Sequence, residues 1–332
     1  MGYNLIGITY DQKRVDYTNA LIQAELSLNR FDSPGKLTFS GVESSGIAMP
    51  EGTSVQFLLD GTVLFQGFVF TVSRDRYGET SYVAYDQLRY LKAKQSYTFT
   101  NQSLEQIITQ ICGDFKLTTG SLAATGYAFP SLIKEDDACI DILFEALSET
   151  IYRTGKIFNL FDDAGKITLK EAKDMIQTVI VGDRSMMTDY TYKRDIDAAT
   201  YNRVKLVRPN KDTGKTDVYM YEDTDTQKQW GLLQYYEKVD ENLNAAQIEQ
   251  LCQAYLKYYN RVTQSLTIDA VGIPGIRPGM MLPVLIGAVD TLKVQRILLV
   301  EKVTHTFEGG AHTMNLEVKN FEQLGGAENG TY

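Results

Sequence analysis

Short runs in which apolar and polar residues alternate fill the first ninety residues of the chain and return in its last third. Alternation with period two turns one face of a strand toward a core and the other toward solvent. The runs AELSLNR and KLTFSG are of this kind, and SVQFLLDGTVLFQGFVF reads as two strands around the hairpin signal Asp60-Gly61. The pattern predicts small antiparallel sheets or barrels, and the 21 tyrosines agree with it because aromatic residues favour strands.

Between residues 93 and 188 the spacing of apolar residues becomes helical. Ser103 and Gln106 form a capping box before one predicted helix, which ends near Gly113. A second predicted helix follows the acidic stretch KEDD and stops at Gly155. Its apolar face consists of Ile140, Leu143, Phe144, Leu147 and Ile151. Next, KIFNLFDDAGKITLK predicts a hairpin, so this part of the chain is expected to be a compact α+β unit.

The changes of period divide the chain into four expected segments. Residues 1–92 are expected to form a first antiparallel β-barrel and residues 93–188 the α+β domain. Residues 189–325 are expected to form a second barrel with one helix, NAAQIEQLCQAYLKYYN, whose apolar stripe packs on its own sheet. Residues 326–332 remain as a C-terminal tail. The expected fold class is therefore mainly β with an α+β insert.

The two predicted barrels resemble each other in sequence. MPEGTSV (49–55) parallels IRPGMML (276–282), and in both regions a strand runs into a glycine turn and back. A constant offset of 231 residues matches Val69 with Val300, Val72 with Val303, Gly78 with Gly309, Val83 with Met314, and Tyr85 with Leu316. The matches predict an internal structural repeat, in which the two barrels share one topology.

Both histidines of the chain lie in the stretch VTHTFEGGAHTMNLEV. A two-residue turn at Gly309-Gly310 needs positive φ, which glycine allows. The resulting register pairs Phe307 with His312, His305 with Met314, and Val303 with Leu316. A zinc site needs at least three protein ligands, and beyond Glu308 the neighbouring sequence offers none. We therefore expect a hairpin with half-buried histidines at a barrel end, and no metal.

Acidic clusters are the remaining candidates for chemistry. Asp136-Asp137 is predicted at a helix start, where carboxylates suit the dipole, and Asp162-Asp163 in a turn. YEDTDTQ (221–227) lacks the spacing of a calcium loop. A glycosidase needs two facing carboxylates, which a sequence neither shows nor excludes. The chain contains no GxSxG, HExxH, P-loop or GxGxxG motif, so no catalytic, cofactor-binding or metal-binding residues are predicted.

Charge and cysteine usage limit the partners. The net charge is −9 and the pI about 4.9, so the chain is not expected to grip nucleic acid. Cys112, Cys139 and Cys252 lie in apolar helical segments without CxxC spacing and are expected to be buried free thiols. The most apolar run, GMMLPVLIGAV, is too short to span a bilayer, and the start of the chain has no signal-peptide pattern, so no membrane insertion is expected.

Several stretches together resemble the baseplate hub proteins of contractile phage tails, of the PBSX prophage type. They are DGTVLFQGFVFTVSRDRYGETSYVAYDQLRYLKAKQSYTF, QIITQICGDFKL, TGKIFNLFDDAGKITL, YNRVKLV and HTFEGGAHTMNLEV. The resemblance spans roughly residues 25 to 320 in order, and AYDQLRYL after the aromatic-x-Gly-x-Val pattern is its most specific part. R-type bacteriocins, which are phage tails without heads, carry similar proteins.

The resemblance implies a structural role in the virion tail, assembled in the bacterial cytoplasm. Such a hub is a homotrimer in which each chain supplies two tail-tube-like barrels, and it joins the sixfold tail tube to the threefold spike. The implied partners are the tail tube protein, the spike protein, the baseplate wedge proteins and the tape-measure protein. DNA would pass through the lumen without specific binding, which an acidic lumen would favour.

Two other classes of function stay open at this point. One is a cell-wall hydrolase acting through paired carboxylates, and the other is a carbohydrate-binding module that uses the many tyrosines. The sequence also leaves open whether the particle is a phage, a defective prophage or a bacteriocin, and which surfaces meet the tube, spike or wedge.

Overall fold

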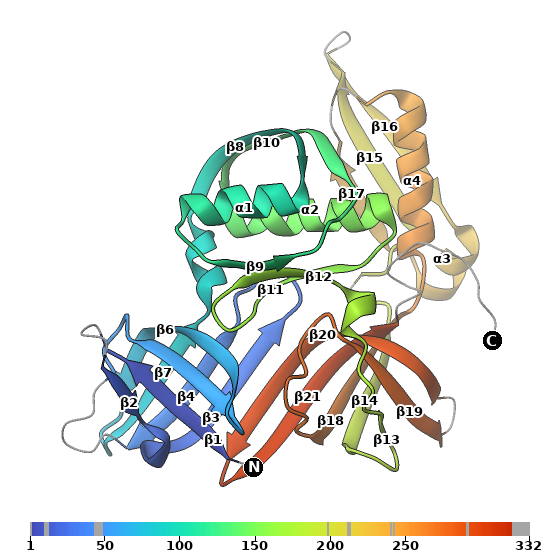
Figure 1. Cartoon of the computed structure of the whole chain (residues 1–332). Helices are drawn as coiled ribbons and strands as arrows, with labels where there is room; N and C mark the ends of the chain where they lie inside the picture. The colour runs from blue at the N-terminus through green and yellow to red at the C-terminus, as the bar shows by residue number, and fades with distance from the viewer. Residues whose placement is uncertain are drawn as a thin grey trace. The chain divides into compact units, whose positions relative to one another are not determined.

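The computed structural model describes residues 2–9, 13–42, 49–197, 199–210, 214–239, 241, 243–289 and 292–320. The chain forms two compact units (Figure 1). Unit 1 consists of Met1–Thr191 and Thr267–Tyr332, and unit 2 of Tyr192–Leu266. The expected tail at 326–332 lies outside the described residues. A mainly β fold with a helical insert is confirmed.

The first part of unit 1 is a set of antiparallel strands, which are β1 (Tyr3–Ile8), β2 (Arg14–Asp16), β3 (Leu21–Asn29), β4 (Lys36–Val42), β5 (Ser54–Leu59), β6 (Thr62–Arg74) and β7 (Glu79–Tyr85). A short 3-10 helix, Thr18–Ala20, precedes β3. The expected hairpin turn at Asp60-Gly61 joins β5 to β6. Alternate side chains of these strands enclose one core, which includes Leu26, Phe39 and Phe57.

The last part of unit 1 repeats this pattern. Its strands are β13 (Val181–Gly182), β14 (Met187–Asp195), β18 (Thr263–Val271), β19 (Met281–Val289), β20 (Leu292–Glu308) and β21 (Ala311–Asn320). The hydrogen-bonded order is β5-β6-β7-β4-β3 in the first part and β19-β20-β21-β18-β14 in the second. Strand for strand, these orders are the same. We call these five-stranded sets the first and second half-sheets.

The half-sheets are parts of one 13-stranded sheet, because β3 pairs with β20. Over the described residues the hydrogen-bonded path runs from β14 to β2 without returning on itself. The barrels expected from the sequence are therefore open curved segments here, joined edge to edge.

Equivalent turns lie directly before β5 in the first half-sheet and before β19 in the second. Gly52 N donates to Val69 O at 2.8 Å, and Gly279 N donates to Val300 O at 2.8 Å. Val69 N and Val300 N donate back to the residues that follow these glycines, Thr53 and Met280. Both glycines have positive φ, 84° and 85°. The parallel between MPEGTSV and IRPGMML is therefore a shared turn.

The offset of 231 holds along β6 and β20 but not along the strands that follow them. A β-bulge interrupts β6 between Val69 and Thr71, and β20 between Val300 and Lys302. In the return strands, Ala84 faces Val69 and Val318 faces Val300. The expected matches of Val83 with Met314 and of Tyr85 with Leu316 are therefore wrong, because β20 and β21 form a longer hairpin. Tyr85 and Leu316 also differ in burial, because Tyr85 is only partly buried whereas Leu316 is buried.

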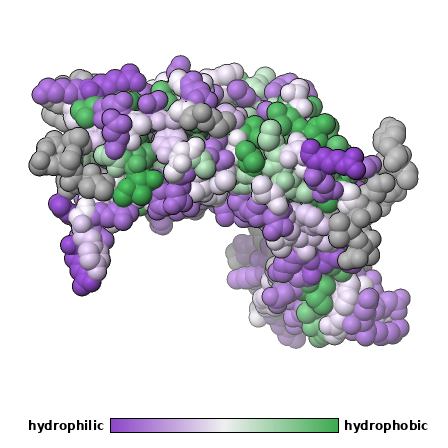
Figure 2. Space-filling view, turned by 90° about the horizontal axis from the view of Figure 1, so that it is seen from below, coloured by the Kyte–Doolittle hydropathy of each residue, from purple (hydrophilic) through white to green (hydrophobic). Residues whose placement is uncertain are grey.

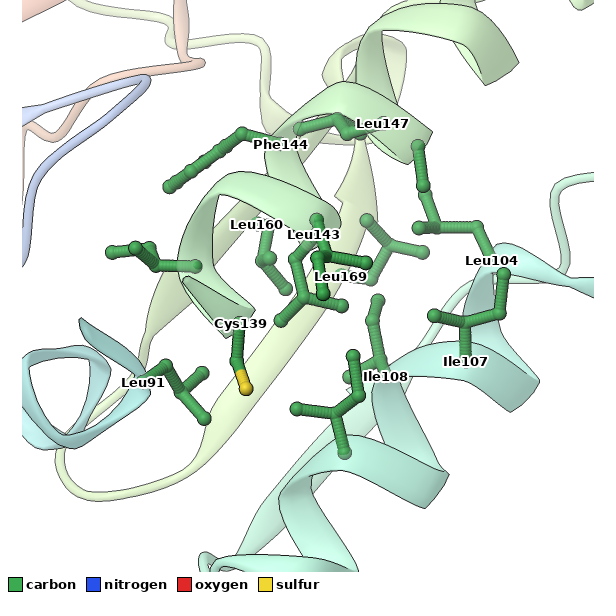
Figure 3. Close-up of a cluster of buried hydrophobic side chains, with 14 of the residues drawn as sticks. Leu91, Leu104, Ile107, Ile108, Cys139, Leu143, Phe144, Leu147, Leu160 and Leu169 are labelled. Carbon is green, nitrogen blue, oxygen red and sulfur yellow. The ribbon is translucent and has the colours of Figure 1, made fainter. Parts of the chain in front are cut away.

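The α+β domain lies between the half-sheets in the sequence. Its elements are β8 (Lys94–Ser103), α1 (Leu104–Asp114), β9 (Thr119–Leu122), β10 (Ala128–Ala138), α2 (Cys139–Thr154), β11 (Phe158–Asp162) and β12 (Ile167–Glu171), with 3-10 helices at Gln87–Lys92 and Ala172–Met175. The helices lie between the pair β8–β10 and the sheet β11-β12-β9 (Figure 1). Figure 3 shows Ile107 and Ile108 from α1, Leu143 from α2, and Leu160 and Leu169 from the sheet in one core.

Both expected helix boundaries in this domain hold. Ser103 and Gln106 form the capping box of α1, and Gly155 ends α2 in the left-handed region with φ 67°. The prediction that Asp136 and Asp137 begin a helix is wrong. They lie near the end of strand β10 rather than begin a helix, because β10 resumes its pairing with β8 after a β-bulge between Lys134 and Asp137 and continues to Ala138.

Unit 2 contains β15 (Arg203–Asn210), β16 (Lys215–Glu222), α3 (Thr224–Trp230), β17 (Gln234–Lys238) and α4 (Ala245–Tyr259). The sheet order is β16-β15-β17, and the apolar stripe of α4 packs on this sheet. These residues were expected to belong to the second barrel. They form a separate unit because Ile248 and Cys252 of α4 complete a core of its own with Val204 and Leu206.

Candidate functional site at the seam between the half-sheets

The seam is the antiparallel pairing of β3 with β20, from Lys302 opposite Asn29 to Glu308 opposite Gln23. Its two faces differ. On the inner face Leu26 and Phe307 are almost fully buried, and both belong to the core of the first half-sheet. On the outer face Ser27 lies opposite Thr304, with the two hydroxyl oxygens 3.5 Å apart.

A groove of about 630 Å³ runs over the outer face of the seam. Its lining residues are Glu25, Ser27, Asn29, Ser33, Pro34, Lys36, Tyr85, Lys92, Lys302, Thr304 and Asn315. Hydroxyl and amide groups dominate this lining, together with three lysines and one glutamate. Lys302 also forms an ion pair with Glu317 at 3.1 Å. The acidity of the whole chain is therefore not concentrated on this face.

A buried arginine ties three parts of unit 1 together next to the seam. Arg30 follows β3 and is 4% exposed. Its Nε donates to Asn159 Oδ1 on β11 at 2.8 Å, and its guanidinium pairs with Glu301 on β20 at 3.1 Å. Asn159 Nδ2 donates to the carbonyl of Gly279 at 3.1 Å. The α+β domain is thus hydrogen-bonded to both half-sheets through side chains that have left water.

Asp86, Asp162 and Arg277 line a cavity of about 30 Å³ beside Arg30. Asp86 accepts hydrogen bonds from the backbone N–H groups of Gly35 and Leu88. Burial, followed by the charge of Asp162, raises the pKa of Asp86 well above its ordinary value of 3.8. Burial likewise raises the pKa of Asp162. Carboxyl groups with raised pKa values can mark a catalytic site, but structural networks produce the same signal.

The size of the cavity decides between these two meanings. A space of about 30 Å³ suits ordered water, whereas ligand sites measure hundreds of Å³. Asp86 and Asp162 therefore do not form the facing carboxylate pair of a glycosidase, which needs room for a sugar ring between them. Their role in the fold is to join segments, since Asp86 begins the 3-10 helix that leads to β8 and Asp162 accepts from Gly165 N in the β11–β12 turn.

The histidines lie in the β20–β21 hairpin with the predicted register, and Gly309 and Gly310 both have positive φ. The prediction that the two histidines are half-buried is wrong. His305 is 1% and His312 6% exposed, rather than half-buried, because the segment that follows β18 packs against both rings, with Gly272 directly beside the His312 ring. His305 Nδ1 lies 3.0 Å from His312 Nε2, and His305 Nε2 lies 2.8 Å from the carbonyl oxygen of Ile276. Burial lowers the pKa of His305 to about 4.

The other candidate residues have structural partners. Asp223, in the cluster YEDTDTQ, caps α3 by accepting from Asp225 N and Thr226 N. Cys112, Cys139 and Cys252 are buried free thiols, as predicted. Within the described part of the chain, no group of three or more His, Cys, Asp or Glu side chains is placed to hold a metal ion. None of the described helices has the length and apolarity needed to cross a membrane.

Sequence reasoning missed the residues that join the parts of unit 1. Arg30, Asn159 and Glu301 come from three distant stretches, and no local spacing connects them. Asp86 lies in AYDQLRYL and Arg277 in IRPGMML, two stretches that had been singled out for other reasons. The sequence signal for such a junction was therefore a charged residue inside a stretch that had already been singled out, as at Asp86 and Arg277.

Exposed hydrophobic side chains also lie on unit 1. Leu285 of β19 is 44% exposed and Ile297 of β20 is 41% exposed. Both lie on the outer face of the second half-sheet, since Pro283, two residues before Leu285, faces Ile297 across the strands. On the side of the molecule seen in Figure 2, hydrophobic residues gather in patches bordered by hydrophilic ones. Patches of this kind are typical of surfaces that other proteins cover.

Comparison with known proteins gives one family, and relatives that match over most of their length. Residues 24–319 match the family described as YQBQ-like. The phage-like element PBSX protein XkdQ of Bacillus subtilis (strain 168) is 34% identical over 308 residues, which cover 90% of this chain and 92% of the relative. The uncharacterized protein YqbQ of the same strain is 32% identical with the same coverage. The 43 kDa tail protein of prophage MuSo2 from Shewanella oneidensis has a similar fold, with a TM-score of 0.72, 12% identity and coverage of 97% of this chain and 99% of that protein.

Proposed function

The chain belongs to the YQBQ-like family, and on that premise we propose that it is a structural protein of the tail and baseplate of a phage or phage-tail-like particle. The observation that carries the proposal is the 34% identity to a PBSX protein over nine-tenths of the chain. The fold, shared with a prophage tail protein, supports it. The proposed role is not enzymatic, since Asp86, Asp162 and Asp223 serve in caps and turns and the two histidines lie in the core.

Within that particle, the chain forms the baseplate hub as a homotrimer. The support is the repeat of strand order in the two half-sheets. Three chains with two equivalent half-sheets each supply six similar wall elements, and a closed ring of this kind matches a sixfold tube on one side and a threefold spike on the other. The tail tube and spike proteins are the axial partners, and the wedge and tape-measure proteins complete the set. Assembly takes place in the bacterial cytoplasm.

The expected acidic lumen receives no support from the groove over the seam. That face carries three lysines beside one glutamate, with one lysine paired to Glu317. If this face lines the ring, DNA would meet hydroxyl and amide groups at nearly balanced charge. Passage without specific binding is still compatible with such a lining, because affinity for DNA requires a cluster of unpaired cations.

Copy number in purified particles tests the proposal. A tagged chain is expressed in its host, tails are isolated after induction, and each protein is quantified by mass spectrometry against the tail tube protein. The proposal predicts three copies of this chain per particle. It also predicts that soluble fractions that degrade cell wall contain none of this chain. Absence of the chain from particles, together with wall degradation that a carboxylate variant abolishes, would identify an enzyme instead.

A further inference from the structure

The junction between the α+β domain and the half-sheets holds more acidic than basic side chains. The cations in the lining of its cavity of about 30 Å³ are Arg30 and Arg277. Arg30 is paired with Glu301 at 3.1 Å, and Arg277 Nη1 lies 3.3 Å from Asp163 Oδ1. Each of these cations therefore has a carboxylate partner of its own before the two buried aspartates of the lining are counted.

Those two aspartates, Asp86 and Asp162, bring two further carboxyl groups to the same cavity. A buried carboxylate is stable only where hydrogen bonds or a cation replace the water that it has lost. Asp86 meets this requirement, because Gly35 N donates to its Oδ2 at 2.8 Å and Leu88 N donates to its Oδ1 at 3.0 Å. Asp86 is therefore the carboxyl group that the fold holds in its charged form.

Asp162 has such a partner on one oxygen only. Its Oδ1 accepts from Gly165 N at 2.6 Å, whereas its Oδ2 is buried and has no hydrogen-bond partner among the described residues. Arg277 is directed elsewhere, since its Nη1 lies 3.4 Å from the backbone oxygen of Asp162 and also contacts Asp163. A negative charge on Asp162 would leave a bare oxygen in the cavity, and a proton on Oδ2 removes that charge.

The electrostatics of the two groups agrees with this distribution of charge. Burial raises the pKa of both carboxyl groups, and the charge of Asp162 raises the pKa of Asp86 further. Two carboxyl groups that interact in this way gain and lose their protons as a pair. The hydrogen bonds then decide which member of the pair carries the proton, and they favour Asp162.

We propose that Asp86 and Asp162 together form a binding site for one proton at neutral pH, carried on Asp162 Oδ2, and that this proton keeps the junction closed. Asp86 follows β7 of the first half-sheet, Asp162 ends β11 of the α+β domain, and Arg277 precedes β19 of the second half-sheet. When the proton passes to solvent, two like charges face one small cavity. Their repulsion and their need for water then favour separation of the α+β domain from the half-sheets.

Hydrogen exchange of two backbone N–H groups reports on the junction. Gly35 N–H and Leu88 N–H donate to Asp86, so their exchange with solvent requires that this carboxyl group move away. In the open junction Asp162 meets water and regains its ordinary pKa of 3.8. Between that value and the raised pKa of the closed junction, the closed form holds a proton that the open form has lost. Each pH unit therefore favours opening by up to about tenfold.

The Asp162→Asn variant tests the proposal in the purified full chain. Its side-chain oxygen can still accept from Gly165 N, and its NH2 group takes the place of the protonated oxygen without a proton that titrates. Exchange rates of Gly35 and Leu88 are compared between the natural chain and the variant at pH 5, 6 and 7. Comparison at equal pH cancels the intrinsic chemistry of exchange. The ratio of natural to variant rate is expected to rise several-fold per pH unit.

Asp163→Asn is the matched control, because it neutralises the neighbouring carboxyl group, which is partly exposed and paired with Arg277. Its exchange rates are expected to stay in a constant ratio to those of the natural chain over the same range of pH. A constant ratio for Asp162→Asn would overturn the proton site. A rising ratio for Asp163→Asn as well would also overturn it, because any lost negative charge near Arg277 would then have the same effect.

The infrared spectrum of the natural chain gives a second answer that does not depend on how a variant folds. At pH 7 ordinary carboxyl groups are ionised, so the C=O stretching band of a protonated carboxylic acid would belong to the buried pair. The expected band corresponds to about one protonated group per chain. Its absence at pH 7 would show that both buried aspartates are charged, and the proposed proton site would be wrong.

Discussion

Arg30 shows how strongly single buried residues determine this fold. Its guanidinium is the donor that links β11 to β20, and both acceptors, Asn159 and Glu301, are largely removed from water. A buried ion pair contributes little net stability compared with an apolar pair of the same shape, but breaking one half of it is costly because a charge is left without its partner.

The Arg30→Leu variant is therefore expected to lower the free energy of unfolding by about 3 kcal/mol. The double variant Arg30→Leu with Glu301→Leu should lose less than the single one, because Glu301 would otherwise keep only the longer contact of 3.8 Å with the exposed Lys319. Chemical denaturation followed by circular dichroism measures both. A double variant that is less stable than Arg30→Leu would show that Glu301 contributes independently of this pair.

The buried histidine pair predicts a pH dependence. Burial lowers the pKa of His305 in the folded chain from its ordinary value of 6.5 to about 4, so the unfolded chain takes up the proton first as pH falls. The stability is fully present above pH 6.5 and is lost as pH falls toward 4, by up to about 1.4 kcal/mol per pH unit for this group.

The measurement is the free energy of unfolding at pH 7, 6, 5 and 4.5 for the natural chain and for His305→Gln. Because carboxylates also titrate in this window, the difference between the two proteins is the informative quantity. The natural chain is expected to lose more stability than the variant between pH 6.5 and 4.5. Parallel curves would contradict the assignment.

At the scale of elements, the repeat offers a matched pair of glycines. Gly52 and Gly279 have the same φ and the same turn, but an added Cβ has open space at Gly52, whereas at Gly279 it would lie 2.2 Å from the side chain of Asn159. Gly52→Ala is expected to cost about 1 kcal/mol from backbone strain alone. Gly279→Ala should cost at least twice as much, because Asn159 must move and its hydrogen bond to Arg30 is lost.

Thermal and chemical unfolding of the two variants measure this difference. The added substitution Asn159→Ala serves as a control, since it removes the side chain that Gly279→Ala would strike, and the extra cost should then shrink. Equal effects of the two alanine substitutions would show that the junction with β11 does not constrain the second turn.

The elements themselves were largely predictable, for local reasons. The Asp60-Gly61 and Gly309-Gly310 turns, the capping box at Ser103 and the glycine that ends α2 each depend on a few neighbouring residues, and all are present. The register of the histidine hairpin followed from the two-residue glycine turn, and the alternation along both strands agreed with it.

What local pattern could not show was which strands pair over long distances. The seam joins residues near 25 to residues near 305, and it replaces two expected closed barrels by one continuous sheet. The separate core of unit 2 was missed for the same reason. The stripe on α4 was recognised, but β15 and β16 read equally well as strands of the second barrel.

At the scale of the whole molecule, the repeated strand order is the feature from which the proposed assembly follows. Two equivalent half-sheets in one chain allow three copies to present six similar surfaces around one axis.

A cryo-electron microscopy map of isolated tails, at a resolution that traces the chain, tests this account most directly. The account predicts three copies of the chain around the tail axis, with six half-sheets at one radius. A map in which the chain lies off the axis, or in which its two half-sheets stand at different radii, would contradict it.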